Sequence, residues 1–416
     1  MESAKNEVVI VGGGIIGLSC AVAAAKTGAK VKVLEKGIVG FGCSYGNAGW
    51  VTPCFAMPLP MPGLLLKSIG WLLDPNSPLY IKPQFSLFMA SWMTKFLTSM
   101  NEKQATAAIE VLVKISQTTL NEFKLLNEKY PSEFGFEQKG LLMLAQTPGG
   151  VNAAVDELKR TERYGVRGKI LKPDDVHQAE PALKGDFAGG VHFLDEAHLE
   201  PLSAVRILKK EAESLGVEVI EHCELLDFDF SNSRLKGIYT TKGRIEADQF
   251  VLAMGAWSKE FAKKVSLSIP ILGGKGYSLI FPRLKRQPQI PLMILEKKIA
   301  VTPRADSIRV AGTLELVDQD FSVTPTRVKA IYNGALRHLD LPDQARVTEV
   351  WRGLRPCTSD GVPMIGRHEQ YNNIVFACGH QMLGLQTSLG TGKLVADILQ
   401  NKTSDLNMKI LDPNRF

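Results

Sequence analysis

The N-terminus of the chain is a short apolar strand that runs directly into a glycine-rich turn. Residues 7–11 read EVVIV, and residues 12–17 read GGGIIG, which has the spacing G-x-G-x-x-G. Gly12 is suited to the tight turn, Gly14 lets a pyrophosphate approach the backbone, and Gly17 lets helix and strand pack closely. These residues predict a strand–turn–helix unit built around a phosphate-binding turn.

The segments that follow complete a strand–helix–strand unit. A helix rich in small residues is expected over 18–27 and a second strand over 30–34, with Glu35 at the end of that strand. The helix N-terminus, which Ile16 closely precedes, offers free N–H groups and a positive dipole end to phosphates, and Ile16 is a candidate cofactor contact. The Glu35 carboxylate can accept hydrogen bonds from ribose hydroxyls. The order of these parts predicts a dinucleotide site for FAD or NAD rather than a purely structural turn.

The composition of the chain is ordinary for a globular protein, with 45% hydrophobic and 22% charged residues. Its 416 residues are enough for two domains. The net charge of +6 is spread along the chain without a basic run, so no nucleic-acid partner is expected. The six cysteines form no CxxC pair and the seven histidines no HExxH motif, so neither a structural metal nor a disulfide framework is expected. Residues 1–6 are too short and polar for a signal peptide, and we expect a cytoplasmic chain.

An uncharged, apolar region follows the first unit. Residues 37–66 carry no charged side chain, but four prolines interrupt them, so this segment cannot cross lipid as a helix. The stretches 61–73 and 85–97 are rich in large apolar side chains. We interpret them as core packing and a wall of a substrate channel. The alternative is a patch that rests peripherally on the inner face of a membrane and meets a lipid-soluble electron acceptor.

Cofactor-type sequence is found at both ends of the chain. A buried strand expected over 250–253 is followed by Gly255 and Trp257, where backbone can approach a cofactor, and glycine-rich sequence returns after residue 378. Enzymes that shuttle hydride with NAD usually keep the nucleotide fold in one block, so this arrangement favours FAD. We predict an α/β two-domain fold, in which a Rossmann-like FAD-binding domain of the glutathione-reductase type is interleaved with a β-sheet-rich substrate domain. The FAD-binding domain is expected over 1–80, 190–265 and 346–416, and the substrate domain, with its helical and apolar insertion, over 81–189 and 266–345.

Three segments resemble the D-amino-acid oxidase superfamily. Residues 35–49, EKGIVGFGCSYGNAG, are similar to its second FAD-contact loop. Residues 351–366, WRGLRPCTSDGVPMIG, are similar to its W-x-G-x-R-P-x-T-x-D-G-x-P-x-I-G signature, and residues 411–416 resemble its common C-terminus. Residues 47–49, the apolar insertion and residues 275–278 most resemble the D-amino-acid dehydrogenase branch. Glycine oxidases and proline or hydroxyproline dehydrogenases share much of this pattern.

The resemblance implies a further set of FAD contacts. They are Lys36, Cys43, Ser44, Asn47, Ala48 and Gly49 in the second loop, and Gly379 and Gly384 beside the flavin ring. The last two precede a helix whose dipole can stabilise negative charge on a reduced flavin. Cys357 does not align with the cysteine that links the flavin in sarcosine oxidases, so we expect non-covalent FAD.

Three residues are candidates for the catalytic site. Arg355 stands where the superfamily's oxidases place the arginine that binds the substrate carboxylate, and its planar guanidinium suits a bidentate contact. The alternative for Arg355 is a structural ion pair on a loop. Tyr277 either offers its hydroxyl to the substrate or is a core residue, and His380 has either a packing or a catalytic role. If the clamp lies elsewhere, the next candidates are Arg304, Arg309 and Arg352.

The resemblance implies oxidative deamination of a D-amino acid to a 2-oxo acid and ammonia. The hydride would pass from the α-carbon to flavin N5, and a quinone or other carrier would take the electrons. One alternative is an oxidase or dehydrogenase of glycine, sarcosine or a proline-like secondary amine. Another is a non-catalytic FAD-binding module, but such a module has no need of the cationic clamp at Arg355.

Overall fold

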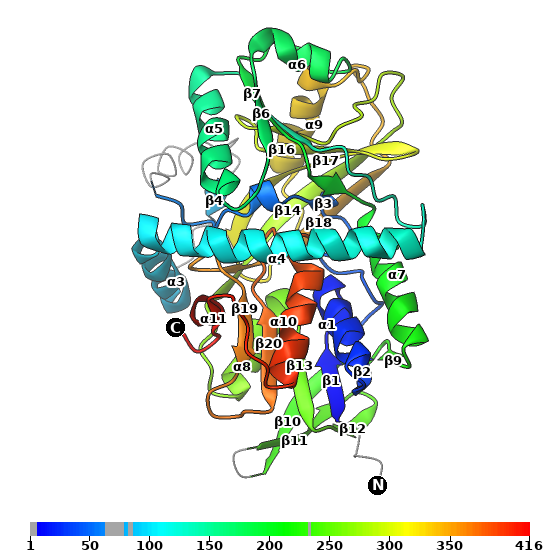
Figure 1. The fold of residues 1–416 in the computed structure, drawn as a ribbon, viewed down its shortest axis with the longest axis vertical. Helices are drawn as coiled ribbons and strands as arrows, with labels where there is room; N and C mark the ends of the chain where they lie inside the picture. The colour runs from blue at the N-terminus through cyan, green and yellow to red at the C-terminus, as the bar shows by residue number, and fades with distance from the viewer. Residues whose placement is uncertain (1–5, 63–78, 82–85, 232–233) are drawn as a thin grey trace.

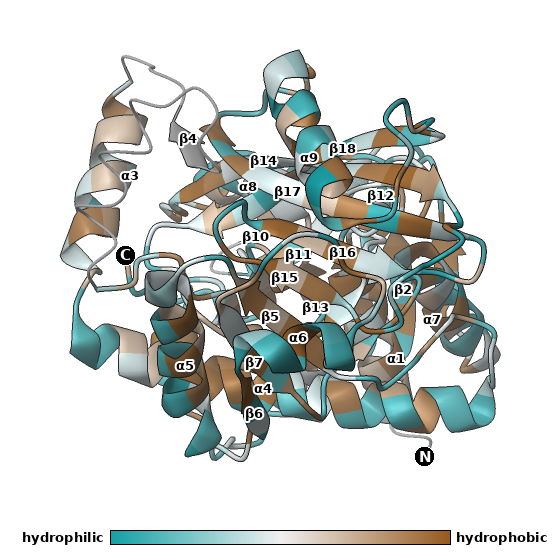
Figure 2. Ribbon diagram, turned by 90° about the horizontal axis from the view of Figure 1, so that it is seen from above, coloured by the Kyte–Doolittle hydropathy of each residue, from teal (hydrophilic) through white to brown (hydrophobic). Residues whose placement is uncertain are grey.

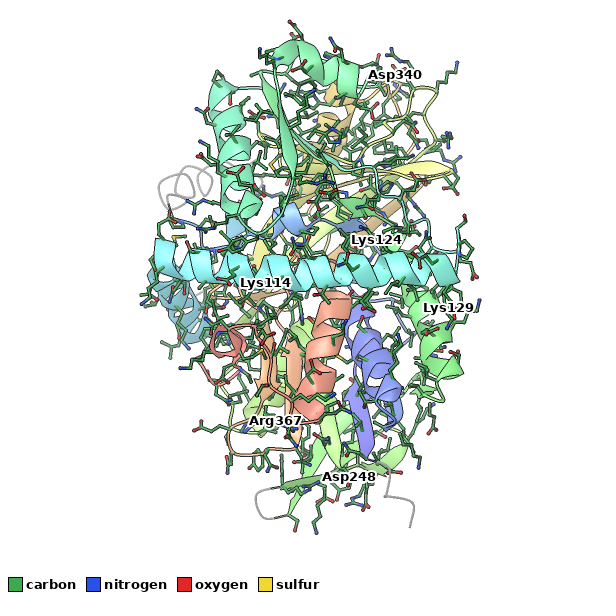
Figure 3. The ribbon with its side chains drawn as sticks, viewed as in Figure 1. Lys114, Lys124, Lys129, Asp248, Asp340 and Arg367 are labelled. Atoms are coloured by element: carbon green, nitrogen blue, oxygen red, sulfur yellow. The ribbon has the colours of Figure 1, made fainter. Side chains whose placement is uncertain are left out.

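The computed structural model describes residues 6–62, 79–81, 86–231 and 234–416, of which 79–81 are described by their backbone alone. Two sheet-containing halves are stacked along the long axis of the molecule, and one long helix lies across the middle (Figure 1). That helix is α4 (Glu102–Lys129), and the labelled Lys114, Lys124 and Lys129 project from it (Figure 3). The residues that line the candidate site come from both halves.

The lower half in Figure 1 is built on a six-stranded sheet. Its order is β19-β20-β13-β1-β2-β9, with bounds Met364–Arg367, Ile374–Cys378, Gln249–Leu252, Glu7–Val11, Lys30–Leu34 and Glu218–Ile220. All strand pairs are parallel except β19–β20. Parallel strands are buried on both faces, which explains the continuous apolar run of β1.

Alternate side chains of β1 pack into two different hydrophobic cores. Val8 and Ile10 belong to the core that includes residues of α1 (Ile15–Lys26), α7 (Pro201–Ser214) and α10 (Ser388–Leu399). Val9 and Val11 belong to a second core with the antiparallel meander. The meander consists of β10 (Leu225–Ser231), β11 (Arg234–Thr240) and β12 (Gly243–Glu246). The sheet is therefore covered by helices on one face and by strands on the other.

The upper half is built on a nine-stranded, mostly antiparallel sheet. Its order is β18-β14-β17-β16-β15-β5-β7-β6, with bounds Glu349–Thr358, Ile271–Pro282, Ser307–Val317, Ile299–Pro303, Leu292–Ile294, Leu141–Ala145, Gly189–Phe193 and Gly168–Leu171, and β4 (Leu79–Ile81) also pairs with β17. Residues of α6 (Pro173–Ala179) and α9 (Pro325–His338) share one core with this sheet, and residues of α5 (Pro148–Glu162) share another. Figure 2 shows hydrophobic residues on central strands such as β5 and β15 and hydrophilic residues on α6.

Helix α4 connects the two halves. Its N-cap is Asn101, whose side chain accepts a hydrogen bond from the N–H of Gln104, and the helix lies against α10. A Cβ atom on Gly390 would lie 2.4 Å from the carbonyl oxygen of Ile115, so only glycine permits this approach of the two helices. Apolar residues at helical spacing predict a helix over 104–128, and the bounds of α4 confirm it.

The strand pairing differs from the expected domain boundaries at two places. Strand β18 falls in the segment assigned to the FAD-binding domain, but it pairs with β14 of the large sheet from Glu349 to Thr358. Strand β7 spans a boundary and also belongs to the large sheet. Neither pairing is visible locally in the sequence. Residues paired between β14 and β18 are 69–87 positions apart in the chain, and those paired between β5 and β7 are 44–52 positions apart.

The apolar stretches are described only in part. Most of the segment 61–73, and Phe85, lie outside the described residues; the rest of 85–97 forms most of α3 (Leu87–Thr98). Met89 and Trp92 are buried, whereas Leu87 is 93% exposed and Leu97 is 43% exposed. Within the described ranges, no helix is long and apolar enough to cross a membrane.

Candidate active site

A cavity of about 1200 Å³ lies between the two sheets. Its lining includes the glycine-rich turn after β1, the loop 36–49, the end of β13, strands β14, β17 and β18, and the turn before α10. Among the predicted cofactor and catalytic residues, Gly17 alone does not line it. The structure thus brings together segments from both ends and the middle of the chain.

The glycines of the first turn have different roles. Gly12 has φ +114°, and a Cβ there would lie 2.4 Å from the Ala253 carbonyl oxygen of the neighbouring strand. A Cβ on Gly17 would lie 1.8 Å from the carbonyl oxygen of Gly12, so Gly17 permits helix–strand packing and does not face the cavity. Gly14 and Ile16 line the cavity at the N-terminus of α1, where N–H groups lack helical acceptors.

Glu35 and Ser44 hold this turn in place. The two carboxylate oxygens of Glu35 accept hydrogen bonds from the N–H of Gly13 at 2.8 Å and of Gly37 at 2.9 Å. The hydroxyl of Ser44 accepts one from the N–H of Ile15 at 3.0 Å. Both Glu35 and Ser44 line the cavity. A carboxylate oxygen has more than one acceptor position, so Glu35 can bind a ribose hydroxyl as well as shaping the turn.

The second loop is ordered by its own polar groups. Asn47 donates from Nδ2 to the carbonyl oxygen of Cys43 at 3.3 Å, and its Oδ1 accepts from the N–H of Gly49 at 2.9 Å. The thiol of Cys43 donates to the Leu354 carbonyl oxygen of β18 at 2.7 Å, and the carbonyl of Ala48 accepts from the Thr302 hydroxyl at 2.7 Å. The loop is therefore attached to the large sheet while it lines the cavity.

Two of the alternative arginines are used to hold structure around this loop. Arg309 is buried and donates from Nη1 to the carbonyl oxygen of Asn47 at 2.9 Å and from Nη2 to Glu200 at 3.2 Å. Arg304 pairs with the same Glu200 at 2.6 Å. Arg352 is exposed and donates to the carbonyl oxygen of Phe321. None of the three lines the cavity, so none has the position of a substrate clamp.

Lys36 and Trp257 meet on one wall. The Lys36 ammonium lies 3.7 Å from the centroid of the Trp257 ring, a cation–π contact. Both residues and Gly255 line the cavity, and a Cβ on Gly255, which has φ +56°, would meet no atom within 4 Å. Open space beside Gly255 allows a ligand to approach the backbone there.

Arg355 is a cation that lines the cavity and is well placed to bind an anionic ligand. Its Nη1 donates to the carbonyl oxygen of Thr313 at 2.9 Å, and within the described residues it has no carboxylate partner. A Cβ on Gly276 would lie 2.1 Å from that same Nη1, so the guanidinium lies directly against the Gly276 backbone. Burial lowers the pKa of Arg355 from its ordinary value, but guanidinium groups remain charged in proteins.

Tyr277 and His380 are both buried and partnered. The Tyr277 hydroxyl accepts a hydrogen bond from the N–H of Thr324 at 3.0 Å, which leaves its proton available to donate. The Nε2 atom of His380 lies 3.1 Å from the Thr391 hydroxyl of α10, and burial lowers the pKa of His380 to about 3. A neutral, helix-bound imidazole fits the packing alternative; a catalytic role for either residue stays a prediction.

Gly379 and Gly384 flank His380 in the turn before α10, and both line the cavity. Gly379 has φ +77°, and a Cβ there would lie 2.6 Å from Cγ2 of Thr358. Gly384 has only ordinary contacts, the nearest being the His380 Cβ at 3.7 Å. This wall is therefore shaped by glycine at Gly379 and is open at Gly384.

Sequence reasoning missed three residues near the site. Thr313 of β17 lines the cavity with φ +62°. Glu157 of α5 also lines it, and burial raises the pKa of Glu157 to about 7. Glu196 is 1% exposed, accepts from the N–H of Cys54 at 3.1 Å, and has its pKa raised by burial to about 8. No local motif predicts these features, because burial and backbone strain depend on the tertiary fold.

The residues of the cavity fit a flavin dinucleotide. Pockets for drug-sized ligands have volumes of about 300–1,000 Å³, and this cavity is larger, at about 1200 Å³. It combines a glycine turn at a helix N-terminus, a carboxylate at a strand end and a second glycine turn before another helix. These features define the class of protein as a flavin-dependent oxidoreductase.

The comparisons with known proteins agree with this class. The family model described as FAD dependent oxidoreductase, DAO, matches residues 7–398, and the chain belongs to that family. FAD is therefore its cofactor. A D-amino acid dehydrogenase of Vibrio atlanticus is 30% identical over 99% of this chain and 100% of its own length. A D-amino acid dehydrogenase of Helicobacter pylori is 29% identical over 98% of each chain.

Solved structures show the same fold. Glycine oxidase from Geobacillus kaustophilus has a TM-score of 0.79 with 22% identity, and covers 99% of this chain and 100% of its own. L-proline dehydrogenase from P. horikoshii has a TM-score of 0.77 with 20% identity, and covers 99% and 98%. The expected α/β two-domain class, with a Rossmann-like sheet and a mixed substrate sheet, is confirmed.

Proposed function

We propose that this protein oxidises a D-amino acid to a 2-oxo acid and ammonia, and passes the electrons to a quinone or another carrier. The observation that carries the proposal is Arg355. It is a cation without a carboxylate partner in the described chain, and it lines the cavity that fits FAD. An amino acid carries the carboxylate that this guanidinium lacks.

Arg355 is placed to orient the substrate carboxylate as well as to attract it. Hydrogen bonding to Thr313 and contact with Gly276 restrict the guanidinium to one position. A bidentate pair with the substrate carboxylate would fix the direction of the α-carbon. When bound, FAD supplies the acceptor for the hydride that leaves that carbon.

The site also accommodates a reaction that needs little acid–base chemistry. His380 is neutral because burial lowers its pKa to about 3, and its ring is bonded to α10. A substrate amine that is already neutral when the hydride leaves needs no protein base. We therefore assign His380 to positioning of the turn 379–384. Tyr277 stays a candidate hydroxyl donor, and its oxygen already accepts a hydrogen bond from the N–H of Thr324.

Exposed apolar side chains on α3 support a lipid-soluble electron acceptor. Helix α3 has Leu87 almost fully exposed and Leu97 partly exposed, while Met89 and Trp92 anchor it to the body of the molecule. Exposed apolar side chains on an anchored helix suit a peripheral contact with the inner face of a membrane and a lipid-soluble quinone. The D-amino acid dehydrogenase relatives support a dehydrogenase in place of an oxidase.

A substrate panel with a redox dye, run with and without oxygen, tests the proposal. We expect the purified FAD protein to reduce the dye with D-amino acids, such as D-alanine or D-proline, and to form little peroxide in air. Turnover restricted to glycine, sarcosine or an L-proline-like amine would select the alternative enzyme. An absence of turnover with every amine would indicate a non-catalytic FAD module.

A further inference from the structure

Thr313 has a backbone conformation that its side chain disfavours. Its φ is +62°, in the left-handed region that β-branched residues rarely adopt. The pairing explains where the conformation arises: Lys275 of β14 pairs with Glu315 of β17, whereas Tyr277 pairs with Gly312. Two residues of β17 therefore lie opposite Gly276, which defines a β-bulge with Thr313 in it.

The side chain of Thr313 has a second unfavourable feature. Its hydroxyl oxygen is buried and has no hydrogen-bond partner among the described residues. A buried polar group without a partner destabilises the folded state, and such groups are few in native proteins. Two separate costs thus coincide in one residue, and that residue lines the cavity.

The same residue is the contact that holds the clamp. The Thr313 carbonyl oxygen accepts the hydrogen bond from Arg355 Nη1 at 2.9 Å. The other non-glycine residues described with positive φ are Ser132, His222, Ser266, Lys298, Gln319, Gln381 and Asn401, none of which is β-branched. Strain at functional residues is retained where it positions a reacting group.

We infer that Thr313 is a substrate-positioning residue. Its left-handed backbone aims the carbonyl at Arg355. Its hydroxyl, which is buried and without a partner among the described residues, turns about χ1 to bond the carboxylate or amine of a substrate held by that arginine. The inference rests on the proposed function, because Arg355 must be the carboxylate clamp. The inference predicts that removal of the hydroxyl stabilises the protein and lowers kcat/KM. Removal of the hydroxyl from a structural threonine would instead lower stability and leave kcat/KM unchanged.

Three substitutions separate the hydroxyl from the backbone. Thr313→Val keeps the shape and should lower kcat/KM by roughly 10- to 100-fold, the range for a lost hydrogen bond to a charged group, mainly through KM. Its melting temperature should be unchanged or higher. Thr313→Ser keeps the hydroxyl and should retain kcat/KM within about threefold. Thr313→Gly removes the strain and should raise Tm by about 1–3 °C, with at least the kinetic loss of the valine variant.

Ser132→Gly is the matched control for strain. Ser132 has φ +63°, is exposed and does not line the cavity, so its replacement should raise Tm with unchanged kinetics. Binding of benzoate to the FAD-loaded protein, followed by the flavin absorbance, provides a readout besides turnover. The valine and glycine variants should bind benzoate more weakly, and the serine variant should bind it like the native protein.

The outcomes distinguish this inference from the proposed function. Native kcat/KM and benzoate affinity in Thr313→Val, or an equal loss in Thr313→Ser, would overturn the role of the hydroxyl. Native kinetics in Thr313→Gly would overturn the role of the strained backbone. If the native protein oxidises no amino acid, the proposed function fails and benzoate affinity decides the inference. A native protein that does neither overturns both.

Discussion

Replacement of Gly276 by alanine should displace the clamp without unfolding the protein. The added Cβ would lie 2.1 Å from Arg355 Nη1 and 2.3 Å from both Cζ and Nη2, whereas ordinary van der Waals contact begins near 3.4 Å. The guanidinium must therefore retreat by more than 1 Å. Because the obstructing atoms are the end of a long side chain, this movement is available at little cost in stability.

The expected loss follows from the size of that displacement. A misplacement of about 1 Å in a positioning group typically costs about a hundredfold in rate. We therefore expect Gly276→Ala to lower kcat/KM for the best D-amino acid by about two orders of magnitude. The assay is steady-state dye reduction under anaerobic conditions, with Tm and the FAD content measured on the same preparation.

Gly149→Ala is the control for an added methyl group. Gly149 is in α5, and a Cβ there would meet no atom within 4 Å. Gly149 also lines the cavity, at an open position of its wall. This variant should keep native kcat/KM, and its Tm should be unchanged or higher because alanine is the better helix former. The reasoning is refuted if Gly276→Ala retains native kcat/KM, or if it loses activity only in proportion to lost FAD or lost fold.

Three further predictions concern the clamp, a buried acid and the cofactor. Arg355→Ala should raise KM and lower kcat together, by about a hundredfold or more in kcat/KM with FAD retained, and Arg355→Lys should recover only part of this because lysine lacks the planar fork; a near-native alanine variant would place the clamp elsewhere. Burial raises the pKa of Glu196 from 4.5 to about 8, so its contribution to stability is full below about pH 4 and is lost as the pH rises through about 8. The Tm of Glu196→Gln should therefore rise relative to the Tm of the native protein between pH 5 and 8.5. The same pH dependence of Tm in both proteins would contradict the raised pKa of Glu196. Acid precipitation should release the FAD into solution, and flavin that stays with the pellet would disprove non-covalent binding.

The sequence predicted those parts of the fold that depend on residues close together in the chain. The turn 12–17 needs glycine for its own backbone and for contacts with adjacent strands, so its residue types predicted its geometry. The apolar residues of 104–128 recur at helical spacing, which predicts a helix there, and α4 confirms it. Apolar residues at helical spacing after Pro201 predict a helix with Leu215 on its inward face. Helix α7 begins at Pro201, but Leu215 is its C-cap and is 39% exposed.

The parts that were missed depend on partners distant in the chain. Arg355 was predicted from its motif, but its fixed position comes from Gly276 on one strand and Thr313 on another. The burial of Glu157 and Glu196 follows from the packing of α5 and of the segment before β8 (Ala197–His198), which no single segment reveals. The sequence therefore predicted residues that line one cavity, but it did not predict the contacts that hold them in place.

The most direct test of amino-acid oxidation is anaerobic reduction of the bound flavin by single enantiomers. The native protein is mixed with D-alanine or D-proline in the absence of oxygen and dye, and the flavin absorbance is followed. We predict that the yellow colour bleaches with a D-enantiomer and remains with its L-enantiomer. Flavin that stays oxidised with every amino acid, or that bleaches with L-enantiomers alone, would contradict the proposed function.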